Sequence, residues 1–221
     1  MKNTTGSINR RQFLKKAGIG SLALASVPAL GHALAEPAAA QADHVRWDII
    51  HLLPVPPAAG TVISAGGEAF AFAYHTPGNP SAAKIRLTGS GTFVAPASGG
   101  PTGAVTGGGT WETSGAGLPA GSGTYKVTGL ARWEFANLQS GGPGFVDTIV
   151  GAGASSNGNA VLRIEYDDGS EGILGIACHG PGAPNGIGEG VIASKGFVTY
   201  WNMELPVPAA DKNRTLFHVR Q

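Results

Sequence analysis

Apolar side chains recur at every second position through most of the chain after residue 42. Between residues 124 and 135, for example, Tyr125, Val127 and Trp133 fall on one face, and charged or hydroxyl side chains fall on the other. A period of two is typical of strands with one buried and one solvated face, and no segment of this region sustains the 3.6 period of a helix. The pattern therefore predicts an all-β fold.

Glycine-rich or proline-rich turns separate the segments that have strand character. One of them, Asp168-Gly169, has the composition of a tight hairpin turn. We expect a single antiparallel, glycine-rich domain over residues 43–221, either a barrel or a strongly coiled sandwich of roughly nine strands. The predicted strands are Val45–Leu53, Glu68–Tyr74, Lys84–Ala95, Ala104–Thr113, Thr124–Phe135, Asn159–Asp168, Glu171–Cys178, Val191–Leu205 and Thr215–Val219.

A short internal repeat supports a strongly bent sheet. The pattern Gly-x-Gly-Thr-aromatic begins at Gly89, Gly107 and Gly121, a spacing of one strand plus a turn. The second glycine of each copy would let its strand bend and let a neighbouring aromatic ring lie over the backbone. A phosphate-binding loop is the alternative, but neither a helical pattern nor a Gly-Lys-Ser/Thr sequence follows any copy.

The first 42 residues have a different composition. Arg10-Arg11 precede Phe13-Leu14-Lys15, an apolar stretch of small residues follows, and small-x-small sites end at Ala35 and Ala42. A basic segment, a short apolar segment and such a site form a secretory signal. The arginine pair and the residues after it resemble the twin-arginine (Tat) export motif of bacteria, with Asn9 where Ser or Thr is often found.

This resemblance implies that residues 1–42 are a Tat signal peptide and short linker, cleaved near residue 35 or 42. The Tat translocase would then be a partner, and the folded domain would be exported to the periplasm or outside the cell. The apolar stretch is shorter than the roughly 20 residues that span a membrane, so we expect no stable membrane anchor. Cys178 is the only cysteine, which suits a domain that folds in the reducing cytoplasm without disulfides.

Charge and histidine spacing exclude several kinds of site. From Asp43 onward the chain has 10 Lys and Arg against 13 Asp and Glu, a net charge of −3 with no basic cluster, so we expect no nucleic-acid partner. No two histidines have the spacing of metal ligands, and we predict neither a metal nor a cofactor. Cys178 alternates with Leu174 and Ile176, which indicates a buried core thiol.

The segment from Cys178 to Glu189 is the strongest candidate for a site. It joins two predicted strands and is too long and too rich in proline for a minimal hairpin. His179 ends one strand and Glu189 opens the next, while His51 lies near the end of the first strand. Histidines and carboxylates can exchange protons near neutral pH, so these three are the candidate catalytic residues. The alternative is a structural loop whose polar ends are solvated.

No reaction follows from these patterns, and three functions stay open. We expect an exported β-domain that binds a small molecule, a carbohydrate or a surface, rather than an enzyme. The alternatives are a cofactor-free isomerase, cyclase or lyase that uses histidine and glutamate, and a structural protein of the envelope or matrix. An apolar pocket with convergent ionisable groups would favour the enzyme. A flat aromatic strip would favour carbohydrate binding, with Trp47, Trp111, Trp133 and Trp201 as candidate side chains.

Overall fold

The structure is a computed structural model that describes residues 43–55, 60–73, 83–96, 100–140, 144–149, 151, 153–204 and 211–220. The predicted signal peptide, residues 1–42, lies outside these residues. The described residues form strands and turns but no helix, which confirms the prediction of an all-β fold. Accordingly, this part of the chain contains no helix long and apolar enough to cross a membrane.

Thirteen strands join into one sheet. They are β1 (Asp43–Val55), β2 (Gly60–Ala65), β3 (Ala69–Phe72), β4 (Lys84–Leu87), β5 (Ser90–Ala95), β6 (Val105–Ser114), β7 (Gly121–Leu138), β8 (Phe145–Asp147), β9 (Ala154–Tyr166), β10 (Glu171–Cys178), β11 (Glu189–Lys195), β12 (Val198–Glu204) and β13 (Thr215–Arg220).

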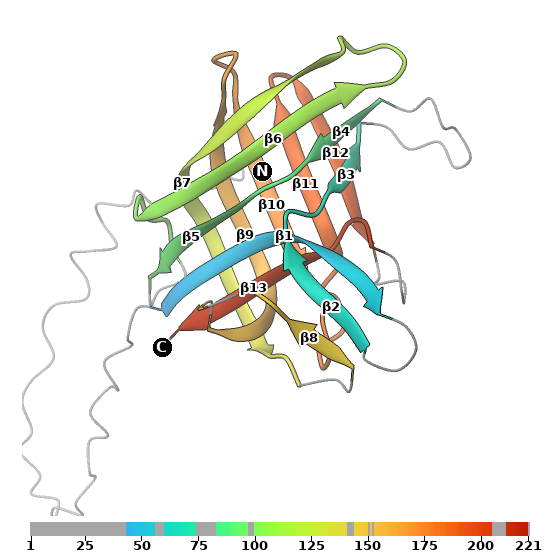
Figure 1. Ribbon diagram of the computed structural model, residues 1–221. Coiled ribbons are helices and arrows are strands. Elements are labelled where there is room, and N and C mark those ends of the chain that lie inside the picture. Colours follow the sequence, from blue (N-terminus) through green and yellow to red (C-terminus); the bar gives the residue numbers. More distant parts are fainter. Residues whose placement is uncertain are drawn as a thin grey trace, which may run out of the picture. The chain divides into compact units, whose positions relative to one another are not determined.

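The strands pair in the order β10-β11-β12-β3-β4-β6-β7-β9-β13-β1-β2-β8. In addition β9 pairs with β10, so the path of pairing returns to its first strand, and β5 pairs with both β1 and β6 (Figure 1). Every described pair is antiparallel except β2 with β8, which is parallel. The sheet is therefore mixed, and the prediction of a purely antiparallel sheet is wrong at this one pair.

The prediction of nine strands is also too low. The predicted strand Lys84–Ala95 divides into β4 and β5 at Thr88-Gly89, and Val191–Leu205 divides into β11 and β12 at a turn where Gly196 has a φ of 57°. The sequence pattern does not predict β2 or β8. Three residues are too few to show an alternation, and β2 lies among short glycine-rich and proline-rich segments.

The three Gly-x-Gly-Thr-aromatic copies do lie on neighbouring strands. They fall on β5, β6 and β7, and β6 pairs with the other two. Backbones approach closely at these glycines: a Cβ on Gly91 would stand 2.8 Å from the indole Nε1 of Trp47 and 2.9 Å from the Cα of Gly107. The glycines thus let strands and an aromatic ring pack where a side chain would not fit.

Interlocking aromatic rings form much of the core. Trp133 packs edge-on against Phe93 at 5.4 Å and against Phe217 at 4.7 Å between ring centroids. These rings come from β7, β5 and β13, and all three are buried. Edge-to-face pairs add stability beyond the area that they bury. The core therefore joins strands that are far apart in the sequence.

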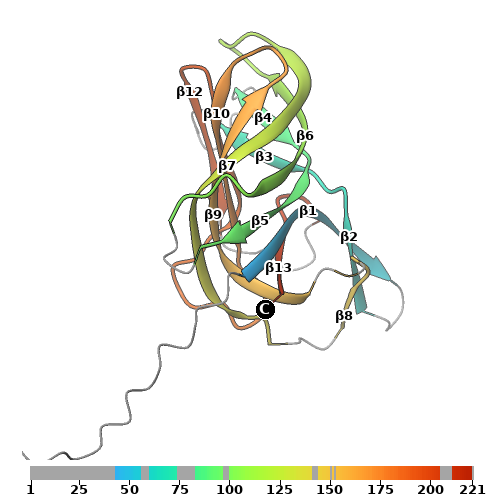
Figure 2. The ribbon, with the colours of Figure 1, turned by 90° about the vertical axis from the view of Figure 1, so that its left-hand side faces the viewer.

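Residues 47–50 of β1 and 215–219 of β13 are buried on both faces of the sheet, so apolar side chains lie on each side of these strands. Trp47 and Ile49 of β1 belong to the core, and the alternation directs Ile50 and Leu52 to the other face. There β2 and β8 lie beside β1 and β13 at one end of the domain (Figure 1). The turns that join β9 to β10 and β11 to β12 lie at the other end (Figure 2).

Candidate functional site

A cavity of about 740 Å³ lies between the β2–β8 pair, β13, the start of β9 and the loop that joins β10 to β11. This volume is within the range of about 300–1,000 Å³ that is usual for small-molecule pockets. Five strands contribute its large apolar side chains, which are Ile50, Leu52, Ile63, Leu138, Phe145 and Leu216. Polar side chains from the β10–β11 loop and the starts of β11 and β13 complete the wall.

Side-chain amides hold the β10–β11 loop in place as one wall of the cavity. The buried Asn157 accepts a hydrogen bond from the Gly180 N–H at 2.7 Å and donates to Asn137 Oδ1 at 2.9 Å. Asn137 in turn donates to the carbonyl oxygen of Gly182 at 2.7 Å. The loop that the sequence singles out is therefore fixed to β7 and β9 rather than solvated on all sides.

Glu189, the first residue of β11, places a carboxylate in the wall with only 3% of the residue exposed. Its Oε2 accepts the His179 N–H at 2.6 Å, and its Oε1 accepts the Thr215 N–H at 2.8 Å. Burial raises the pKa of Glu189 to about 7, although these hydrogen bonds and the nearby Arg214 act in the opposite direction. Near neutral pH the group can therefore both give and take a proton.

His179 follows β10 and is half-buried at the same cavity. Its ring Nδ1 lies 2.6 Å from the carbonyl oxygen of Ile187. Because a carbonyl only accepts hydrogen bonds, Nδ1 carries the proton in this contact, and the neutral ring keeps its lone pair on Nε2. The imidazole is thus oriented by the loop, with a proton acceptor at its other nitrogen.

Two of the three candidate residues from the sequence meet at this cavity. His179 and Glu189 both line it and are joined through the His179 N–H. His51 does not line it, since its neighbours Ile50 and Leu52 do, and successive side chains of a strand point to opposite faces. The His51 ring instead lies 3.2 Å from the Asp211 carboxylate. The structure therefore separates His51 from the other two residues.

Cys178 also contacts the cavity but is buried, as the sequence pattern predicts. Gln139 Nε2 donates a hydrogen bond to its Sγ at 3.3 Å. Burial first, and then the charge of Glu189, raises the pKa of the thiol well above its usual range. A thiol that stays protonated is a poor nucleophile, so Cys178 is a packing residue of this site.

A second ionisable pair at the cavity has no counterpart among the sequence predictions. Asp147 of β8 lines the cavity and lies 2.6 Å from Nε2 of the buried His218 on β13. Nearby on the same side of the sheet, the buried Asp48 makes two hydrogen bonds with Arg46 at 2.7 and 2.8 Å. The Asp147–His218 pair depends on β8, a strand that the alternation of side chains does not predict.

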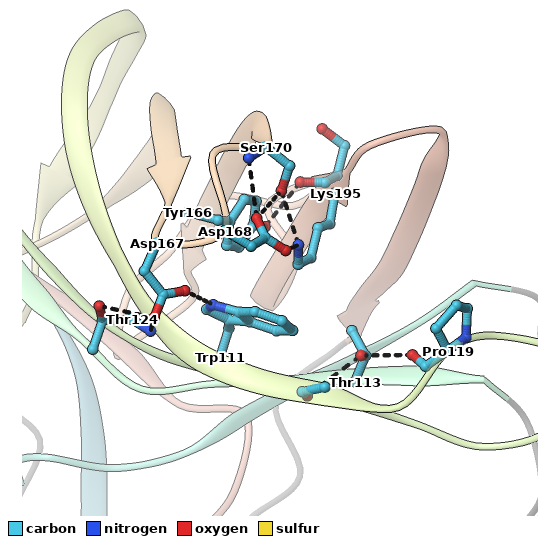
Figure 3. Close-up of polar contacts among 11 residues, drawn as sticks. Trp111, Thr113, Pro119, Thr124, Tyr166, Asp167, Asp168, Ser170 and Lys195 are labelled. Atoms are coloured by element: carbon cyan, nitrogen blue, oxygen red, sulfur yellow. Dashed lines mark hydrogen bonds and ion pairs between the residues drawn. The ribbon is translucent and has the colours of Figure 1, made fainter.

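A separate polar cluster lies toward the opposite end of the domain. Lys195 ends β11, so it stands about 20 Å along the strand from Glu189. Its ammonium group pairs with Asp168 and lies 4.2 Å from the Trp111 ring centroid and 4.7 Å from that of Tyr166 (Figure 3). None of these residues lines the cavity. The Lys195 ammonium group therefore has its partners within the fold, which indicates a structural role.

The structure offers little for carbohydrate binding through tryptophan. Trp47, Trp111 and Trp133 are buried. Of the four tryptophans only Trp201, which is 61% exposed, could stack its ring on a sugar. Among the described residues, no group of three or more His, Cys, Asp or Glu side chains could hold a metal ion. The cavity is therefore the feature from which a function can be argued.

Comparison of the chain with protein-family models, with curated proteins and with solved structures finds no match.

Proposed function

We propose that residues 43–221 form a closed, barrel-like domain that binds a small, largely apolar molecule. The cavity of about 740 Å³, with apolar walls and polar groups gathered at the start of β11, carries this proposal. The pairing of β9 with β10 supports closure of the sheet, because it returns the path of hydrogen bonds to its first strand. A purely structural protein would not need a cavity of this size.

Filling the cavity should abolish binding of a neutral apolar probe. Ala154 lines the cavity at an exposed position, so Ala154→Trp should place an indole in it with little cost to folding. We expect wild-type protein to bind N-phenyl-1-naphthylamine, which fluoresces strongly in apolar surroundings. The variant should bind it at least about tenfold more weakly, equivalent to about 1.4 kcal/mol.

A matched control is Ala120→Trp, an exposed position that does not line the cavity. This variant should bind the probe as the wild type does. Equal binding by both variants, or no fluorescence change with the wild-type protein, would count against the cavity as the binding site.

Acid–base catalysis is the second candidate, and the buried Glu189 beside the oriented His179 favours it. A carboxyl group with a pKa of about 7 suits proton transfer at neutral pH. Glu189 would take a proton from a carbon next to a carbonyl group, leaving the electron pair in an enolate, and would return the proton elsewhere on the substrate. Deuterium exchange into the apolar ketone 2-tetralone would distinguish this activity from binding alone.

We also propose that the Tat pathway exports the domain, on the basis of Arg10-Arg11 and the residues that follow. Replacing both arginines with lysine should leave folded precursor in the cytoplasm, because the Tat machinery reads the arginine pair. Fractionation followed by immunoblotting would measure this. Secretion that is unchanged, or that depends on the Sec channel, would contradict the assignment.

A further inference from the structure

Four hydrogen-bond donors beside Glu189, at the polar end of the cavity, have acceptors within the protein. The Thr215 hydroxyl donates to the carbonyl oxygen of Ala177 at 2.6 Å, and the Thr215 N–H donates to Glu189 at 2.8 Å. The N–H of His179 donates to Glu189 at 2.6 Å, and that of Gly180 donates to Asn157 at 2.7 Å. The protein therefore already uses each of these donors.

Hydrogen-bond acceptors at the same end retain capacity. An ionised carboxylate can accept about four hydrogen bonds, and Glu189 receives one short backbone bond on each oxygen. A second contact, from the Thr215 hydroxyl, is longer at 3.4 Å and competes with that hydroxyl's bond to Ala177. His179 adds its Nε2 when the ring is neutral, because Nδ1 is bonded to Ile187.

The charged groups around Glu189 do not change the excess of hydrogen-bond acceptors over donors at this end of the cavity. Arg214 lies near enough to act on the carboxylate electrostatically, and it has an interaction partner within the protein. Across the cavity, Asp147 adds a second carboxylate, which His218 contacts. On β10 the thiol of Cys178 is buried. Of the charged groups named here, Arg214 is basic, and Glu189 and Asp147 are acidic.

We propose that the ligand is an apolar molecule with a hydroxyl group, and that this hydroxyl donates a hydrogen bond to the Glu189 carboxylate. The inference rests on the proposed binding function and names the class of molecule that the cavity takes. The apolar walls hold the apolar part of the ligand, and the carboxylate selects the position of the hydroxyl. Binding strengthens as Glu189 ionises, because a charged acceptor makes a stronger hydrogen bond than a neutral one.

Three probes of similar size test this inference: 2-naphthol, 2-methoxynaphthalene, which lacks the donor, and the anion 2-naphthoate. At pH 8.5 we expect 2-naphthol to bind at least about tenfold more tightly than 2-methoxynaphthalene, as a hydrogen bond to a charged group allows. The advantage should shrink between pH 8.5 and pH 5.5, as Glu189 takes up a proton. Isothermal titration calorimetry measures all three probes on the same protein.

Two variants test whether the Glu189 carboxylate is responsible. Glu189→Gln should remove most of the preference for 2-naphthol, whereas Glu165→Gln, which changes a carboxyl paired with Lys126 away from the cavity, should keep it. If Glu189→Gln does not fold, the comparison of probes and its pH dependence on wild-type protein still decide the question. Equal binding of 2-naphthol and 2-methoxynaphthalene, or tighter binding of 2-naphthoate, would overturn the inference but leave the binding function. Binding of none of the three would overturn both.

Discussion

Gly109→Ala should destabilise the domain by about 3 kcal/mol, although it adds a single methyl group. A Cβ at this position would overlap the carbonyl oxygen of Thr88 and would stand 2.6 Å from the Thr88 carbonyl carbon and 2.7 Å from the Gly89 Cα. These are backbone atoms at the bend between β4 and β5, so neither a rotamer change nor a small shift relieves the overlap. Urea unfolding followed by circular dichroism measures the loss.

Gly103→Ala is the matched control, because a Cβ there meets nothing within 4 Å and Gly103 does not have a positive φ. Its free energy of unfolding should stay within about 0.5 kcal/mol of the wild-type value, as for most surface substitutions. Equal stability of the two variants would show that the strands of the repeat do not approach as closely as the structure indicates.

The alternation of side chains predicts most strands but fails where the register shifts. On β7 the sequence places Leu130 on the solvated face and Phe135 on the buried face. Leu130 is buried and Phe135 is 44% exposed. An irregularity between Val127 and Gly129 shifts the pairing with β9 and moves Leu130 to the buried face, and a second between Leu130 and Arg132 restores the alternation, so that Trp133 is buried as predicted. Phe135 directly precedes a third irregularity, between Phe135 and Asn137. A bulge leaves no signal in the period of two.

The sequence predicts those parts of the site whose residues lie on either side of one loop. It does not predict contacts between residues that only the tertiary fold brings together. His179 and Glu189 flank one loop, so antiparallel pairing of β10 with β11 brings their ends together. His51 satisfies the same sequence criterion, but its place in the alternation of β1 turns it away from the cavity. Asp147 and His218 are 71 residues apart and meet only because β8 packs beside β13.

Between pH 4.5 and about pH 7, Glu189 should lower the stability of the fold as the pH rises. Its pKa is about 7 in the folded protein against 4.5 for an ordinary glutamate, because burial disfavours the charged form. In this window the folded state binds more protons than the unfolded state, so the free energy of unfolding falls with increasing pH. A difference of this size corresponds to about 3 kcal/mol between pH 4.5 and pH 8.

Urea unfolding of the wild type and of Glu189→Gln between pH 5 and pH 8 measures this effect. The amide introduced by Glu189→Gln does not titrate, so the variant should lose the downward slope even if its stability is lower at every pH. Glu165→Gln, which removes an exposed carboxyl paired with Lys126, should keep the wild-type slope. The ion pair of Asp168, whose pKa is lowered to about 2 by Lys195 and Ser170, weakens only at more acidic pH and does not interfere.

Each variant replaces one carboxyl group by an amide, so the difference between the wild-type and Glu189→Gln curves reports the Glu189 carboxyl. Parallel curves for the wild type and Glu189→Gln would show that this carboxyl is ionised in the fold as readily as in water. A proton-exchanging role for it at neutral pH would then have no basis.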